Sequence, residues 1–249
     1  RWICLADLNS NGWLDLFVPD VAGEQSVILW GGADGFSIER SQILSVHHAA
    51  CARPADLNGN GYLDLIVGGH TPTLTGPLDS FAYIYWNGPD GLSEDRRTLL
   101  PANAINSMAV ADFNNDGLLD LYIGSYHDAR ERDIDSYIYW NREGRGFSAT
   151  DRTRLFTHSA SGSLAADFNE NGWVDLAIAY HRVESEHKAY SAVWWNGPDG
   201  FDEKNVTLLP TEGPHGISSV DPGNLADRGP DEYYVSAPFE LPEGSSVAS

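Results

Sequence analysis

Four short acidic loops recur through the chain, and each carries oxygen-bearing side chains at the same positions. Position 1 is Asp, position 3 is Asn, position 5 is Asn or Asp, position 6 is Gly and position 9 is Asp. Oxygen ligands at this spacing, with a glycine that permits a sharp turn, suit a hard divalent cation such as calcium. The four loops span residues 7–15, 56–64, 112–120 and 167–175.

A second interpretation needs no metal. The Asn-Gly pair could simply form a hairpin turn that the aspartates cap through hydrogen bonds. A turn alone does not require Asp at both ends, and all four copies have it, so the metal interpretation is favoured. No acid or base residue accompanies the loops, which indicates that the calcium would be structural and not catalytic.

The elements that position these loops also repeat. The first Asp recurs at intervals of 49, 56 and 55 residues, and each loop is followed by an alternating apolar run. A second landmark is an aromatic strand that ends in Trp30, Trp86, Trp140 or Trp195 and is followed by a glycine-rich turn. Residues 97–100, 152–155 and 206–209 read as an outer fourth strand. Four short strands in about 50 residues are typical of a β-propeller blade, although a β-solenoid is the competing architecture.

The repeats resemble the FG-GAP/VCBS family, the calcium-binding propeller blades that also occur in integrin α subunits. The loops and the strands that follow them carry the resemblance, from Trp2 to about Ala237. It implies an all-β β-propeller of four-stranded antiparallel blades. It also implies calcium ligands from positions 1, 3, 5 and 9 and from the backbone carbonyl of position 7: Asp7, Asn9, Asn11, Trp13 and Asp15; Asp56, Asn58, Asn60, Tyr62 and Asp64; Asp112, Asn114, Asp116, Leu118 and Asp120; Asp167, Asn169, Asn171, Trp173 and Asp175.

The third loop has three carboxylates where the others have two, so we expect it to bind calcium most tightly. A fifth copy, residues 220–231, is longer and lacks the Asn-Gly turn, which argues against a fifth calcium site. The predicted blades are about 1–48, 49–104, 105–159 and 160–214, with a partial blade at 215–239 and a linker at 240–249. Related propellers often have seven blades, so we expect the remaining blades to come from a parent chain or a partner.

All eight histidines fall in the connections predicted for the face opposite the calcium loops. His70, His127 and His181 occupy matching positions at the end of strand two. Polar loops near the axis of a propeller commonly bind ligands. The candidate ligand-binding residues are therefore His70, His127, His158, His181, His215, Arg130 and Arg182. Repetition of a structural histidine by duplication is the alternative.

Composition narrows the function. The formal net charge of −21 argues against binding nucleic acid or an anionic membrane. No apolar stretch is long enough to span a membrane, and Cys4 and Cys51 are expected to be buried thiols and not a disulfide. We expect an extracellular, periplasmic or cell-surface recognition or adhesion module that binds a glycan or a protein. A polysaccharide lyase or other carbohydrate-active enzyme and a scaffold segment are the alternatives; without an evident acid–base pair, the enzyme is less favoured.

Overall fold

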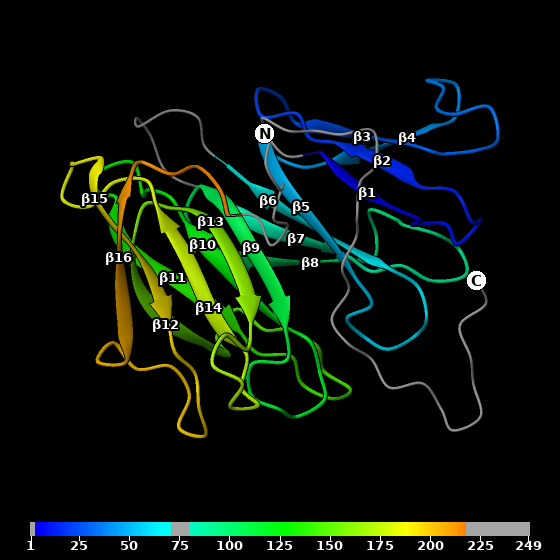
Figure 1. Cartoon of the computed structure of the whole chain (residues 1–249). Coiled ribbons are helices and arrows are strands. Elements are labelled where there is room, and N and C mark those ends of the chain that lie inside the picture. Colours follow the sequence, from blue (N-terminus) through cyan, green and yellow to red (C-terminus); the bar gives the residue numbers. More distant parts are fainter. Residues whose placement is uncertain (1–2, 71–79, 218–249) are drawn as a thin grey trace, which may run out of the picture. The chain divides into compact units, whose positions relative to one another are not determined.

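The structure is a computed structural model, and it describes residues 3–70 and 80–217. Within these ranges the regular structure consists of sixteen β-strands and no helix. The strands form four antiparallel sheets of four strands each (Figure 1). The predicted all-β class and the four-stranded blade are confirmed. The predicted fifth loop and partial blade at 218–239 lie outside the described residues.

Each sheet is built from consecutive strands, and neighbours in sequence are neighbours in the sheet. The first sheet contains β1 (Cys4–Ala6), β2 (Asp15–Val18), β3 (Gln25–Leu29) and β4 (Ser41–Ser45). The second contains β5 (Ala49–Ala55), β6 (Asp64–Gly69), β7 (Phe81–Tyr85) and β8 (Arg97–Pro101). The third contains β9 (Ile105–Ala111), β10 (Asp120–Ser125), β11 (Asp133–Tyr139) and β12 (Arg152–His158). The fourth contains β13 (Ala160–Ala166), β14 (Asp175–Tyr180), β15 (Lys188–Trp194) and β16 (Val206–Glu212).

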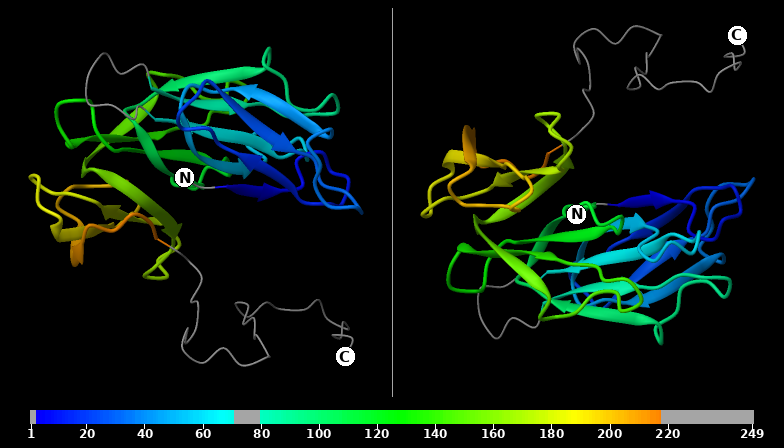
Figure 2. Two further views of the ribbon diagram at one scale, coloured as in Figure 1. Left: turned by 90° about the horizontal axis from the view of Figure 1, so that it is seen from above. Right: turned by 90° about the horizontal axis from the view of Figure 1, so that it is seen from below.

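The first strands of successive sheets contact one another, β1 with β5, β5 with β9, and β9 with β13. Strand one of each blade is therefore the inner strand and strand four the outer one, as in a propeller. The four sheets follow one another in sequence colour, from blue to orange, in both views of Figure 2. Each acidic loop joins strands one and two of its sheet, as the repeat pattern predicts.

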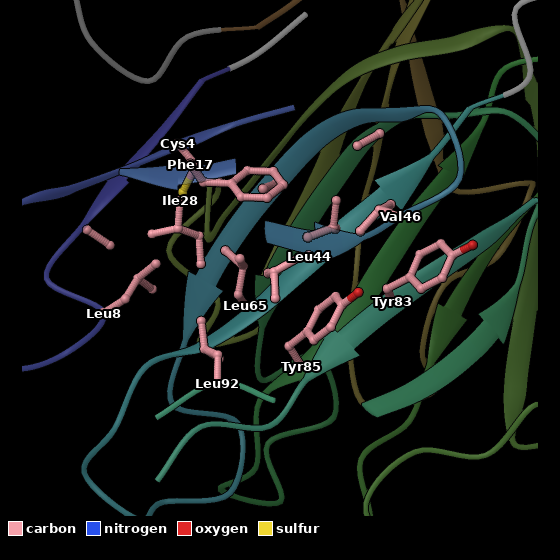
Figure 3. Packing of buried hydrophobic residues seen from close by; sticks show 14 residues of the cluster. Cys4, Leu8, Phe17, Ile28, Leu44, Val46, Leu65, Tyr83, Tyr85 and Leu92 are labelled. Carbon is pink, nitrogen blue, oxygen red and sulfur yellow. The ribbon is translucent and has the colours of Figure 1, made fainter. Parts of the chain in front are cut away.

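Apolar side chains fill the space between adjacent sheets. Phe17, Ile28 and Leu44 of the first sheet and Leu65 and Tyr85 of the second are fully buried in one cluster (Figure 3). Alternation along each strand puts these residues on the faces that neighbouring sheets share. Cys4 and Cys51 are both buried, and burial raises the pKa of the Cys4 thiol.

Two glycines let the inner strands approach closely. A Cβ on Gly68 would lie 2.6 Å from the side chain of Ile105, and one on Gly124 would lie 2.2 Å from the hydroxyl of Ser107. Both glycines stand near the end of strand two, where β6 and β10 pass the first strand of their own or the next sheet. The close packing at the inner strands therefore requires the absence of a side chain at these two positions.

Candidate metal loops and histidine cluster

The four acidic loops fold in the same way. In each loop the carboxylate of position 1 accepts hydrogen bonds from the backbone N–H groups of positions 5 and 6. In the first loop these bonds join Asp7 to Asn11 at 3.0 Å and to Gly12 at 2.8 Å. The other loops differ from these lengths by no more than 0.1 Å. This wrapping gathers the oxygen-bearing side chains of positions 1, 3 and 5 around one short turn.

The backbone of these loops needs a left-handed residue at two positions. Position 6 is Gly in every copy, with φ between 84° and 87°. Position 4 is also left-handed, at Ser10, Gly59, Asn115 and Glu170, with φ between 56° and 69°. The invariant Gly of the motif is thus explained by backbone geometry. Position 4 tolerates other residues at a modest cost in strain.

The aspartate at position 9 has a second role that the motif does not reveal. Asp15 is fully buried, and its two oxygens accept bonds from the N–H of Leu8 and the N–H of Gly31, both at 2.8 Å. The same pair of bonds recurs at Asp64, Asp120 and Asp175. The position 9 carboxylate therefore joins the start of the loop to the turn that follows strand three.

Burial makes these carboxylates unusual acids. It raises the pKa of Asp64 to about 6 and that of Asp120 to about 7, although two backbone N–H donors oppose the shift in each case. The charges of Asp112 and Asp116 raise the pKa of Asp120 further. The third loop, with three acidic side chains, thus concentrates the most negative charge.

An asparagine after each of the last three tryptophan landmarks ties one sheet to the sheet before it. The side-chain amide of Asn87 donates to the carbonyl of Leu8 in the first loop, at 2.6 Å, and to that of Leu63 in its own loop, at 2.9 Å. Asn141 makes the same two bonds to Leu57 and Leu119, and Asn196 makes them to Phe113 and Val174. All three asparagines are buried. The first sheet has Gly31 at this position.

The third loop differs from its neighbours at position 5. The amides of Asn60 and Asn171 donate to the carbonyls of Asn87 and Asn196, whereas Asp116 has no amide with which to do so. The nearby guanidinium of Arg142 pairs with Asp151 at 2.7 Å. That bond raises the pKa of Arg142, and the charges of Asp116 and Asp120 add to the effect. Arg142 therefore offsets part of the negative charge of the third loop.

The ligand set implied for calcium is chemically compatible with these loops. Every donor is a carboxylate, amide or carbonyl oxygen, which calcium prefers. A carboxylate oxygen has two lone pairs, so positions 1 and 9 can hold a cation while they accept N–H bonds. Glu24, His47 and His48 are the one group of three acidic, histidine or cysteine side chains with ligand atoms all within 4.8 Å in residues 3–70 and 80–217. The three carboxylates of the third loop are therefore less closely gathered than this group.

The histidines at the other end of the strands form a connected series of rings across three sheets. His70 contacts Tyr126 and His127, with ring centroids 6.0 and 5.6 Å apart. Tyr126 contacts His181 at 5.7 Å. His181 in turn contacts His187 at 4.5 Å and His215 at 4.0 Å. We call these six residues the histidine cluster.

The seven predicted ligand-binding residues divide into three sets. His70, His127, His181 and His215 belong to the histidine cluster, but His70 and His127 are buried. His158 lies apart, where it pairs with Asp133 at 2.6 Å and contacts Tyr180 and Tyr190. The guanidinium of Arg182 donates to His187 at 2.9 Å, and Arg130 is exposed. Arg182 thus lies beside the cluster.

Arg132 is the basic residue that the sequence pattern did not select for the site. Its guanidinium carbon lies 4.8 Å from the centre of the Tyr126 ring, and it donates to Ser159 at 3.1 Å. Burial, chiefly, lowers the pKa of His181 to about 4, with contributions from His215, His187 and Arg132. A bond to the carbonyl of Gly213 opposes the shift. The His181 ring is therefore neutral at physiological pH.

Comparison with known proteins agrees with this geometry. Residues 7–67 and 73–123 match the family described as FG-GAP-like repeat. The chain carries FG-GAP-like repeats. This confirms the family inferred from the loops and strands, and FG-GAP-like repeats form β-propellers. A search of curated proteins found no match.

In this FG-GAP-like repeat protein the third and fourth sheets have the same strand order and loop geometry as the two matched repeats. A polar pocket of about 150 Å³ lies among the inner strands, lined by Ile3, Arg53, Asn106, Ser107, Ser161, Gly162, Ser163, Gly216 and Ile217. No helix among the described residues could cross a membrane.

Proposed function

We propose that this FG-GAP-like repeat protein is a calcium-stabilised extracellular recognition module. In this proposal it binds a glycan or protein ligand through the face that carries the histidine cluster. The observation that supports it most is the contrast between the two ends of the sheets. Four loops with all-oxygen donors fold alike at one end, and rings from three sheets meet at the other.

Calcium would be held by side-chain oxygens of positions 1, 3, 5 and 9 and by the carbonyl of position 7. It would neutralise carboxylates that the fold already brings together and would fix each loop against the turn after strand three. FG-GAP-like repeats are typically extracellular, where calcium is abundant. Calcium titration by calorimetry, with thermal unfolding in calcium and in chelator, tests this part. An unchanged melting temperature and no binding heat would refute it.

The recognition surface consists of the exposed members of the histidine cluster and the arginine beside them. His187 and His215 are exposed, and Arg182 holds His187 in place. Imidazole and guanidinium groups can donate hydrogen bonds to sugar hydroxyls, carboxylates and peptide carbonyls. The ligand is therefore expected to be polar and at least partly acidic, since basic groups gather here on an otherwise acidic chain.

A glycan array and a screen of extracellular proteins test the recognition proposal directly. His215→Ala and Arg182→Ala should each weaken the binding that the screen finds. His47→Ala, in the first sheet and outside the cluster, is the matched control and should leave it unchanged. Equal binding by all three variants would place the ligand elsewhere.

One observation also favours the enzyme alternative. Tyr126 lies between His181, whose neutral ring could accept a proton, and Arg132, whose guanidinium could neutralise a uronate carboxylate. A polysaccharide lyase needs these three functions. Incubation with uronate-containing polymers, followed by the ultraviolet absorbance of the unsaturated product, distinguishes this reaction from binding alone. Loss of that signal in Tyr126→Phe would support the lyase, and no signal from the unmodified protein would exclude it for the polymers tested.

A further inference from the structure

The junction between the first and second sheets is closed by an arginine on the outer strand. Arg97, the first residue of β8, donates to the carbonyl of Ser45 on β4 at 3.0 Å and pairs with Glu94 at 2.6 Å. Its guanidinium carbon lies 5.8 Å from the ring centre of Tyr83 and 6.0 Å from that of Tyr85. The slot between these sheets therefore holds a guanidinium group between aromatic rings, a carboxylate and a carbonyl.

The junction between the second and third sheets is built in the same way. Arg152, the first residue of β12, donates to the carbonyl of Pro101 at 3.2 Å and to the hydroxyl of Tyr139 at 2.6 Å. Its guanidinium carbon lies only 3.9 Å from the ring centre of Tyr137. Two successive junctions thus use an arginine from the same strand position to fill the same kind of slot.

At the junction between the third and fourth sheets the arginine is missing. Strand pairing identifies the equivalent residues, because Arg97 pairs with Tyr85, Arg152 pairs with Tyr139 and Val206 pairs with Trp194. Val206 therefore stands where the guanidinium would begin, and Trp194 replaces the tyrosine.

The carboxylate of this slot is retained. Glu203 stands three residues before Val206, as Glu94 stands three residues before its partner Arg97. Among the residues that the structure describes, no Lys, Arg or His forms an ion pair with Glu203. The third junction has kept the acidic group and has lost the basic group that pairs with its counterpart.

A pocket of about 240 Å³ lies at this third junction. It is lined by Phe156, Tyr190, Trp194, Glu203, Val206 and Leu208, together with the rings of His158 and Tyr180. Phe156 occupies the place on β12 that Pro101 occupies on β8, the fifth residue of the outer strand. The lining combines aromatic walls with one carboxylate, which is the environment that attracts organic cations. The strong negative charge of the chain adds to that attraction.

We propose that this pocket, which we call the junction slot, binds the guanidinium group of an arginine side chain on a partner polypeptide. The partner's arginine would take the place that Arg97 and Arg152 fill in the other two junctions. Glu203 would form the ion pair, and the aromatic side chains would contact the planar cation. The junction slot needs neither calcium nor the exposed members of the histidine cluster, so this site is separate from the proposed recognition surface.

The test uses a blocked peptide, acetyl-Gly-Arg-Gly amide, titrated into the full chain and followed by NMR chemical shifts. We expect weak binding, with a Kd of about 1 mM, and shifts centred on the junction slot. The same peptide with citrulline, which is neutral and nearly isosteric with arginine, should not bind. Equal binding of the citrulline peptide would overturn the proposal, and equal binding of the lysine peptide would overturn the assignment to guanidinium.

Variants of the chain sharpen this result. Glu203→Gln should weaken peptide binding by about threefold to fivefold, whereas Glu212→Gln, an exposed acid on the same sheet, should have no effect. Val206→Arg should abolish binding, because the new side chain would occupy the junction slot as Arg97 does in its own junction. Its thermal unfolding would show that it is folded. Undiminished peptide binding by a folded Val206→Arg variant would refute the proposal.

Discussion

The loop end and the histidine end of the sheets follow different rules. At the loop end four repeats reproduce the same hydrogen bonds to within 0.1 Å. At the histidine end each repeat contributes different residues, so that buried His70 and His127 lie beside exposed His187 and His215. Backbone geometry dictates the first arrangement, because a turn with two left-handed residues leaves few alternatives. Little in the backbone constrains the second.

The difference shows where variation is tolerated. A substitution in a loop affects the strand pairing, the turn after strand three and the neighbouring sheet, because position 9 and the following asparagine bond to all of them. A substitution at the histidine end changes mainly the surface. We therefore expect stability to depend on the loop end and ligand specificity on the histidine end.

The largest effect should come from the position 9 aspartate. Asp175→Ala removes the acceptor of two buried N–H groups, those of Phe168 and Asn196, and should lower the free energy of unfolding by about 3 kcal/mol or more. The measurement is denaturant unfolding in excess chelator, which separates this role from calcium binding. Asp199→Ala, in an exposed turn, is the control and should change stability by less than about 0.5 kcal/mol. A loss seen only with calcium present would mean that Asp175 serves as a ligand alone.

A smaller loss should follow from removing the asparagine that links two sheets. Asn196→Ala leaves the buried carbonyls of Phe113 and Val174 without this donor and should cost about 2 kcal/mol. Asn205→Ala, at an exposed position of the same repeat, is the matched control. If both variants unfold at the same denaturant concentration, the link between the sheets contributes nothing to stability.

Calcium affinity should distinguish the third loop from the other three. Asp116→Asn should weaken the tightest calcium-binding event by about tenfold, because one of three carboxylates is lost. The new amide could donate to Asn141 as Asn60 does to Asn87, so stability in chelator should not fall. The reverse change, Asn60→Asp, should strengthen the second site. Calorimetry that finds the tightest site unaffected by Asp116→Asn would assign it to another loop.

The smallest effect should be the pH dependence contributed by His181. Its pKa falls from the ordinary 6.5 to about 4 in the folded protein, so the unfolded chain binds a proton more readily between these values. Stability from this group is therefore present above about pH 6.5 and is lost as the pH falls toward 4. His181→Gln should flatten the profile by less than about 1 kcal/mol, because the ring is partly exposed to solvent. Thermal unfolding across this range measures the slope, and an unchanged slope would contradict the pKa shift.

Much of the fold could be predicted from the sequence because its signals are local. The loop motif and the tryptophan landmark lie a constant distance apart within each repeat, so they fix the number and order of strands. The outer strands predicted at 97–100, 152–155 and 206–209 extend slightly further in the structure, to Pro101, His158 and Glu212. The fourth strand of the first sheet, Ser41–Ser45, had no comparable signal and was found only in the structure.

The site could be predicted less completely. The motif identifies Asp15 and its three counterparts as calcium ligands but not as acceptors for two backbone N–H groups, because one of those donors is 16 residues away. A signal for the linking asparagine was present, since three of the four tryptophans are followed by Asn. Its partner, however, lies in the previous repeat, 79 residues away for Asn87. Spacing within one repeat cannot reveal a contact between two.

The sequence by itself determined the repeat, the blade, the loops and their all-oxygen donors. These follow from short-range constraints, chiefly the left-handed glycine and the alternation of apolar residues along each strand. Only the tertiary structure decided which histidines meet, which are buried, and that Glu203 lacks the arginine that its counterpart Glu94 has. Those facts depend on how separate sheets pack against each other, and packing brings together residues that no local pattern connects.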